Sequence, residues 1–301
     1  MARFWLATRP YSFTAAAVPA FLGTATSKLL NPAIYISWVS FFLVLIGCVA
    51  IQTVSNLVND LFDAKSGLDN LENFGKMNCI VSGLVTKQEV INLILVACLI
   101  SASIGAYFVS QVGIPMLGVV AFGGILAIEY TAPPLKLKYR ALGDIAVMLG
   151  FGLGMVFGAY MVQAHGDPGY LGAGQLTRLL AYSLPSALLV VGILHANNHR
   201  DRANDHEYGA VTLGNVLSEA ASKNLLLGLI VGAYAISILT AVAGITSWYN
   251  LIVLLSVPPL IPILKAIRVN DYSMSVPNIA KLHGLFGLLT TIGVVLKIVL
   301  H

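Results

Sequence analysis

The sequence predicts an all-α protein, a polytopic bundle of nine transmembrane helices that forms one domain over residues 1–301. Hydrophobic residues make up 57% of the chain and charged residues only 10%, and the mean hydropathy is +0.85. Soluble domains carry far more charge than this, so the chain belongs in a lipid bilayer. The chain also contains nine apolar stretches, each long enough to cross about 30 Å of hydrocarbon.

These stretches occupy residues 12–29, 34–60, 89–110, 114–131, 142–163, 178–198, 221–243, 248–268 and 279–299. The first of them has the character of a signal sequence, but eight more follow it, so we expect it to be retained as a helix. Long polar segments at 59–87 and 197–222 follow the second and the sixth stretches.

The distribution of basic residues predicts the topology, because Lys and Arg accumulate in cytoplasmic loops. With the N-terminus in the cytoplasm, only Lys28, Arg178 and Lys297 of the seventeen Lys and Arg residues fall on the opposite side. We therefore expect the N-terminus and both long polar segments to be cytoplasmic and the C-terminus to lie on the other side.

Charge and cysteine content exclude several classes of protein. The net charge of +4 is small and dispersed, so no nucleic-acid partner is expected. The three cysteines, Cys48, Cys79 and Cys98, show no C-x-x-C spacing, which argues against a zinc cluster or a disulfide framework. The sequence gives no indication of an oligomeric state.

The end of the second apolar stretch carries a stripe of polar side chains. Asn56, Asp60 and Asp63 follow one another at spacings of four and three, which places them on one helix face. Asp69 extends this acidic group into the following loop. Carboxylates at such a depth normally face a bundle interior, a wet cavity or a bound cation.

The sixth stretch ends in a similar way. Asn197, Asn198, Asp201 and Asp205 lie at its predicted cytoplasmic end, with the two aspartates one turn apart. Both acidic groups leave the membrane on the same predicted side, so we expect them to face each other across one cavity. The four-residue step between Asn and Asp recurs in both segments, which suggests a duplicated four-helix unit followed by a ninth helix.

Carboxylate and amide oxygens without paired cysteines suit Mg²⁺, which usually holds a phosphorylated substrate together with the protein. The pattern therefore predicts a diphosphate substrate whose charge the ion neutralises as the leaving group departs. Four basic residues on the predicted cytoplasmic side could supply further positive charge: Lys136, Lys138, Arg140 and Arg200.

Other interpretations of these residues remain open at this point. The acidic residues could be solvated caps, with Arg200–Asp201 and Arg202–Asp205 as surface ion pairs. His195 and His199 have the spacing of zinc ligands, but no Glu follows His195 as H-E-x-x-H requires. A role for Glu129 and for the basic residues at 136–140 is not decided by the sequence.

The residues form two linked motifs, Asn59-Asp60-x-x-Asp63 with Gly67-x-Asp69, and Asn197-Asn198-x-Arg200-Asp201-x-x-x-Asp205. These motifs resemble those of the UbiA superfamily of intramembrane prenyltransferases, and most closely its 1,4-dihydroxy-2-naphthoate polyprenyltransferases of menaquinone biosynthesis. Similar flanking segments are Arg9-Pro10, Ser82-Gly83-Leu-Val-Thr86, Tyr130-Thr131-x-x-Pro134, Tyr139-x-x-Leu142-Gly143-Asp144 and Gly209-x-x-Thr212-Leu213.

The resemblance implies nine helices around a central cavity that is capped on the cytoplasmic side and open laterally to lipid. It implies a polyprenyl diphosphate donor, a small aromatic acceptor and two Mg²⁺ ions held by Asn59, Asp63, Asp201 and Asp205, with Asp60 and Asp69 assisting and Asp69 counted among the metal ligands. The catalytic residues would be Asp60, Asp63, Asp201 and Asp205. By the same likeness, the substrate-binding residues would be Arg9, Asn56, Lys138, Tyr139, Asn197, Asn198 and Arg200. In the naphthoate branch, the prenyl group replaces the carboxyl group of the acceptor.

The chain departs from the family pattern at two places. The superfamily often has Asp where this chain has Gly67, with Asp69 displaced, as in the naphthoate branch. A basic residue often found just before Ser82-Gly83 is missing, and Lys76 is the candidate to replace it.

Two competing functions follow from the same residues. The first is the same chemistry with another acceptor, namely 4-hydroxybenzoate, homogentisate, a glyceryl phosphate lipid or a chlorin, or a cyclisation without an acceptor. The second is an ion-coupled transporter, which predicts broken helices near the membrane midplane rather than acidic clusters at helix ends.

Overall fold

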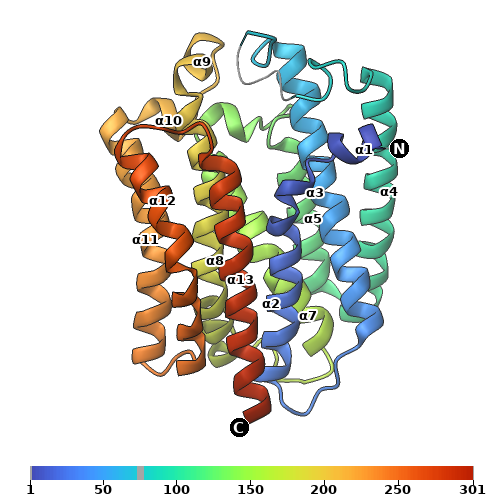
Figure 1. Cartoon of the computed structure of the whole chain (residues 1–301). Coiled ribbons are helices and arrows are strands. Elements are labelled where there is room, and N and C mark those ends of the chain that lie inside the picture. The colour runs from blue at the N-terminus through green and yellow to red at the C-terminus, as the bar shows by residue number, and fades with distance from the viewer. Residues whose placement is uncertain (1, 73–77, 301) are drawn as a thin grey trace.

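The structure, a computed structural model, describes residues 2–72 and 78–300. The described residues form helices and no strands, so the all-α prediction is confirmed. Long helices run side by side along one axis, with the N-terminus at one end of the bundle and the C-terminus at the other (Figure 1). The short helices α1 (Ala2–Ala7), α9 (Arg202–Glu207) and α10 (Leu213–Val216) lie at the N-terminal end.

Seven of the described helices are long and apolar enough to cross a membrane. Five are continuous: α3 (Trp38–Ser66), α4 (Lys87–Val112), α8 (Ala173–Arg200), α11 (Glu219–Val242) and α13 (Ser275–Leu300). The other two are composite, namely α6 (Gly143–Val147) with η4 (Met148–Gly154) and α7 (Met155–Ala164), and η5 (Trp248–Ser256) with α12 (Val257–Arg268).

The predicted count of nine spanning helices is therefore not confirmed. The first and fourth predicted stretches form α2 (Thr14–Leu30) and α5 (Ile114–Glu129), which have 17 and 16 residues. At about 1.5 Å per residue these helices reach about 24 to 26 Å, less than the hydrocarbon thickness of a typical bilayer.

Capping residues determine where α3 begins and ends, and both ends differ from those predicted by hydropathy. The second stretch, predicted over 34–60, starts as α3 at Trp38, because the Ser37 side chain caps it by accepting from the backbone N–H of Ser40. It continues to Ser66 and ends at Gly67, whose φ of 78° closes the helix in the left-handed conformation. The acidic stripe of α3 is therefore helical throughout.

The interior consists of two main apolar clusters. One joins α2, α3 and α7 around the fully buried Tyr160, and the other joins α8, α11, α12 and α13 around Phe286. Helix α2 packs against α3, α7, α8 and α13, which places it between the two clusters. The polar ends of α3 and α8 emerge from this frame at the N-terminal end (Figure 1).

Candidate active site

A cavity of about 160 Å³ lies inside the bundle below the polar ends of α3 and α8. Its lining combines a charged rim with apolar walls and comes from η1 (Pro10–Phe13), α2, α3, η4 and α8 and from the segment after α5. Among the predicted site residues, the following line it: Arg9, Asn56, Asn59, Lys138, Asn197 and Asn198.

Asp63 is the centre of the charged rim and is almost completely buried. The Lys138 ammonium donates to its Oδ2 at 2.5 Å, and the Asn59 amide donates to the same oxygen at 2.7 Å. The Tyr139 hydroxyl donates to its Oδ1 at 2.9 Å. Lys138 and Tyr139 belong to η3 (Leu137–Arg140), so a segment 75 residues further along the chain supplies the partners of α3.

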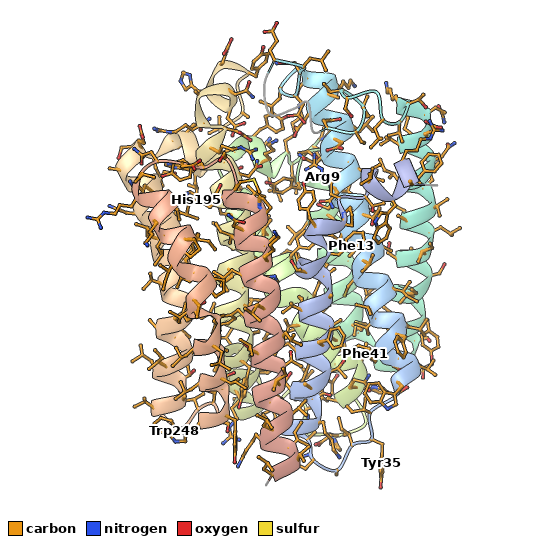
Figure 2. The ribbon with its side chains drawn as sticks, viewed as in Figure 1. Arg9, Phe13, Tyr35, Phe41, His195 and Trp248 are labelled. Carbon is orange, nitrogen blue, oxygen red and sulfur yellow. The ribbon has the colours of Figure 1, made fainter. Side chains whose placement is uncertain are left out.

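Asp60 has a different environment from Asp63. Its fully buried carboxylate forms an ion pair with Arg9 and accepts from the backbone N–H of Cys79 at 3.0 Å. Arg9 lies at the N-terminal end of the bundle beside α3 (Figure 2). With both oxygens engaged, Asp60 holds the N-terminal segment and the loop after α3 in place.

Asn78 fixes the loop after α3. It lies close to the position before Ser82-Gly83 at which the family pattern often has a basic residue. Its amide donates to the backbone oxygen of Asp60 at 2.8 Å and to Asp69 Oδ2 at 2.9 Å. Asp69 thus lies next to the Asp60–Asp63 turn. The proposed substitute, Lys76, lies outside the described residues.

The second acidic group lies at the junction of α8 and α9. Arg200 forms a bidentate pair with Asp201, with both N···O distances at 2.7 Å, and it also donates to Asn197 Oδ1 at 2.9 Å. Thr212 donates to Asp205 at 3.3 Å. The predicted Arg200–Asp201 ion pair is therefore present, whereas Arg202 pairs with Glu219 rather than with Asp205.

The two acidic segments meet above the cavity, as their shared topology predicts. The Asn204 amide donates to the backbone oxygen of Leu68 at 3.1 Å, and the Asn70 amide donates to the Tyr208 hydroxyl at 3.2 Å. The loop after α3 and helix α9 therefore form a common roof over the cavity.

Burial and neighbouring charges both shift the pKa values of ionisable groups near this roof. Burial raises the pKa of the Asp205 carboxyl to about 7, with Lys138 opposing the rise and Asp201 adding to it. Burial alone would lower the pKa of the Lys138 ammonium, but Asp63, Tyr130 and Asp205 raise it above its ordinary value. Lys138 therefore stays charged and is attracted by both acidic segments.

The predicted metal ligands were Asn59, Asp63, Asp69, Asp201 and Asp205. Within 2–72 and 78–300, no three His, Cys, Asp or Glu residues are grouped closely enough to hold a metal ion by themselves. The donor set nevertheless fits Mg²⁺, because it is made of oxygens and carries more acidic than basic groups. It fits an ion that receives several ligands from a substrate rather than one held in a protein cage.

His195 and His199 belong to a buried hydrogen-bonded chain and not to a zinc site. His195 Nδ1 lies 2.8 Å from Asp144 Oδ2, and its Nε2 lies 3.0 Å from the Ser222 hydroxyl. The same hydroxyl is 2.7 Å from His199 Nδ1. The second Asp144 oxygen accepts from the Asn198 amide at 3.3 Å. The position of His195 near the end of α8 is visible in Figure 2.

Asp144 and Ser222 were not among the predicted site residues. Asp144 appeared only within a flanking motif, although one Asp inside an otherwise apolar stretch is itself a signal of a buried polar role. Among the other undecided residues, Glu129 accepts from the backbone N–H of Leu135, and Arg140 donates weakly to the Pro134 oxygen. Neither of the two lines the cavity.

Replacement of Asp144 by Ala is expected to lower the free energy of unfolding by about 3 kcal/mol, because it leaves His195 and Asn198 buried without their partner. Asp144→Asn, which keeps an acceptor oxygen, is expected to cost less. Thermal unfolding in detergent, followed by circular dichroism, measures both. Equal melting temperatures for wild type and Asp144→Ala would contradict the prediction.

A comparison with known families decides what kind of protein this is. The model of the UbiA prenyltransferase family matches residues 16–286. The chain belongs to this family. The prediction that it is a prenyltransferase is thereby confirmed, and the UbiA assignment argues against the alternative of an ion-coupled transporter.

Individual relatives agree with the UbiA assignment. UbiA prenyltransferase domain-containing protein 1 of Dictyostelium discoideum is 30% identical over 298 residues, which cover 97% of this chain and 87% of the relative. Likeness to the 1,4-dihydroxy-2-naphthoate enzymes is not shown by this relative and stays a prediction.

Two solved structures share the fold. The apo structure of a UbiA homolog from Aeropyrum pernix K1 aligns with a TM-score of 0.71 and 16% identity, over 94% of this chain and 97% of that one. The structure of a UbiA homolog from Archaeoglobus fulgidus bound to GPP and Mg²⁺ aligns with a TM-score of 0.64 and 14% identity, over 99% of each chain.

Proposed function

We propose that this UbiA-family protein transfers a polyprenyl group from polyprenyl diphosphate to a small aromatic acceptor, for which 1,4-dihydroxy-2-naphthoate is the first candidate. The observation that carries the proposal is the meeting of two acidic helix ends around Lys138, directly above a cavity inside a membrane bundle. A charged rim over an apolar interior suits a substrate with an anionic head and a hydrocarbon tail.

The rim is proposed as the diphosphate site. Mg²⁺, which the Archaeoglobus homolog binds together with GPP, would neutralise the diphosphate as it leaves and would be held by Asn59, Asp63, Asp69, Asp201 and Asp205. Lys138 and Tyr139 are both held on Asp63, so their donors are preorganised at the rim. Arg200 supplies a second positive charge from the opposite segment.

An apolar pocket of about 400 Å³ is proposed to receive the hydrocarbon tail. It lies between α3, α4, α5 and the α6–α7 segment and shares Phe151 with the polar cavity. Three of its lining residues, Phe122, Ile128 and Leu149, are exposed, which supports a pocket that is open to the lipid. In this arrangement α2 and α5 also cross the bilayer, giving nine crossings, and the rim faces the cytoplasm.

The proposed reaction balances without a further reactant. The bond between the allylic carbon and the diphosphate oxygen breaks, and the diphosphate leaves with the electron pair. The electron-rich acceptor ring attacks the allylic carbon at the ring position that bears the carboxylate. Carbon dioxide then leaves, and its bonding electrons restore the aromatic ring, which gives a prenylated naphthohydroquinone.

The test is an assay of the detergent-solubilised protein with labelled geranylgeranyl diphosphate and separate acceptors: 1,4-dihydroxy-2-naphthoate, 4-hydroxybenzoate and homogentisate. We expect a prenylated naphthohydroquinone in Mg²⁺ and a loss of at least about 100-fold in rate with excess EDTA. Product with only another acceptor would retain the chemistry and replace the acceptor. Absence of diphosphate release with every acceptor would refute the proposed function.

A further inference from the structure

The orientation of the Asn198 amide determines what it presents to the cavity. Its nitrogen donates to Asp144 Oδ1, and this carboxylate is itself fixed by His195. A carboxylate accepts hydrogen bonds, so the amide nitrogen must face Asp144. The Asn198 carbonyl oxygen therefore points the other way and accepts no hydrogen bond from the described part of the chain.

This oxygen faces space that a ligand can reach. Asn198 is 3% exposed, and it lines the cavity. Its Oδ1 has no partner among the described residues, yet it is not fully enclosed by the protein. The accessible space next to this buried side chain is the cavity, so the cavity has a fixed hydrogen-bond acceptor on its α8 wall.

A second acceptor lies on the α3 wall of the same cavity. The Gln52 amide donates to Asn56 Oδ1 at 3.1 Å, and the Asn56 amide donates in turn to Ser12 Oγ and to the Thr8 backbone oxygen. Gln52 Oε1 is buried and has no hydrogen-bond partner among the described residues. A buried acceptor without a donor costs free energy unless a ligand or a water molecule supplies one.

The remaining lining of the cavity separates it from the diphosphate site. The basic side chains in the lining, Arg9 and Lys138, are already paired with Asp60 and Asp63 at the rim. Phe151, Val190 and Ile193 form apolar walls. Two acceptor oxygens between apolar walls suit a flat ring that carries hydroxyl groups.

We propose that Asn198 Oδ1 and Gln52 Oε1 recognise the hydroxyl groups of a dihydroxyaromatic acceptor. This inference rests on the proposed function, and it names the residues that select the acceptor. Asn198 Oδ1 already faces the cavity, whereas Gln52 Oε1 is enclosed in the cavity wall and turns toward the ring when the acceptor binds. Each oxygen then accepts one hydroxyl hydrogen, so the ring is held between α3 and α8. An analogue that lacks a hydroxyl hydrogen leaves a buried acceptor unpaired and binds more weakly.

The experiment compares enzyme variants and methylated substrates together. Gln52→Leu and Asn198→Ala each remove one acceptor oxygen, and Gln52→Glu keeps an acceptor at the first position. The matched control is Gln88→Leu, because Gln88 forms the same four-residue contact with Asn92 on the exposed surface of α4. The acceptors are 1,4-dihydroxy-2-naphthoate and its two monomethyl ethers.

In the wild type and in Gln88→Leu, we expect each methyl ether to raise the acceptor KM about 10-fold or more. In Gln52→Leu and in Asn198→Ala, we expect the KM for the diol to rise to a similar extent, while the KM for geranylgeranyl diphosphate is unchanged. In each of these variants, the ether methylated at the hydroxyl that the lost oxygen would bind has no higher KM than the diol. We expect Gln52→Glu to discriminate again against the ether that Gln52→Leu tolerates. Equal losses for the diol and both ethers, or a parallel rise in the diphosphate KM, would overturn the proposal.

Equilibrium binding separates this inference from the proposed function. Binding of 1,4-dihydroxynaphthalene and of its monomethyl ether to the purified protein is measured by calorimetry in the same variants. If no prenyl transfer occurs but the wild type still prefers the diol and the variants do not, only the proposed function fails. If transfer occurs and the variants keep the wild-type preference in both assays, only the inference fails. Melting temperatures show which variants are folded.

Discussion

Asp63→Asn is expected to lower the rate of prenyl transfer by about 100-fold or more while the protein remains folded. The substitution keeps the shape of the side chain but removes the charge on which Lys138 and Tyr139 converge. Lys138 then loses the counter-charge that holds it at the rim. Single-turnover rates with labelled geranylgeranyl diphosphate measure the effect.

Asp167→Asn is the matched control, because Asp167 lies in the loop between α7 and α8 and its carboxylate accepts from the nearby backbone N–H of Gly169 at 2.9 Å. It is expected to retain the wild-type rate. Lys138→Met, alone and combined with Asp63→Asn, tests whether the two residues act as a unit, in which case the double variant is little slower than either single one. Near-normal turnover of Asp63→Asn would contradict its assignment to the diphosphate site.

Gly214→Ala is expected to lower both stability and activity, by about 1 to 3 kcal/mol and about 10-fold or more. A methyl group at Gly214 would lie 2.3 Å from the Asn198 backbone oxygen and 2.9 Å from the His199 nitrogen. Both contacts are with backbone, so the end of α8 must shift. Asn198 and Asp201 shift with it, away from the cavity and the rim. Melting temperature and kcat are the two measurements.

Gly228→Ala is the control for this prediction. Gly228 lies in α11, and no atom within 4 Å would meet an added methyl group. Alanine favours the helical conformation, so the melting temperature of this variant is expected to be unchanged or slightly higher. If Gly214→Ala and Gly228→Ala had similar melting temperatures and kcat values, the close contact between Gly214 in α10 and the end of α8 would not be needed for stability or activity.

Hydropathy and the two Asn–Asp motifs predicted the parts of the molecule that depend on local sequence. They placed a helical segment at each apolar stretch and the acidic groups at one end of the bundle. They placed Asp60 and Asp63 on one helix face, but they did not distinguish the two roles. That distinction depends on partners far along the chain, Arg9 for Asp60 and Lys138 for Asp63, which are 51 and 75 residues away.

The same limit explains why the sequence did not indicate the proposed acceptor contacts, although the motif did place Asn198 among the substrate-binding residues. The proposed role of the Asn198 oxygen follows from the contact of its amide with Asp144, 54 residues away, and that of Gln52 follows from an oxygen left without a partner among the described residues. Neither is a property of local pattern, because the helix packing creates both. The crossings of α2 and α5 are not confirmed for a related reason, because the apolar stretches predicted at 12–29 and 114–131 each include residues that lie outside the helix.

The shared position of Phe151 has a consequence for how products leave. One aromatic ring borders both the polar cavity and the apolar pocket, and exposed residues such as Phe122 line the apolar pocket. In the proposed reaction, cleavage divides the donor near this boundary into a water-soluble anion and an oil-soluble chain. The proposal then predicts that the anion departs through the roof toward water, while the lengthened aromatic product diffuses sideways into the bilayer. An enzyme of this design would sort its products by solubility without a separate export step.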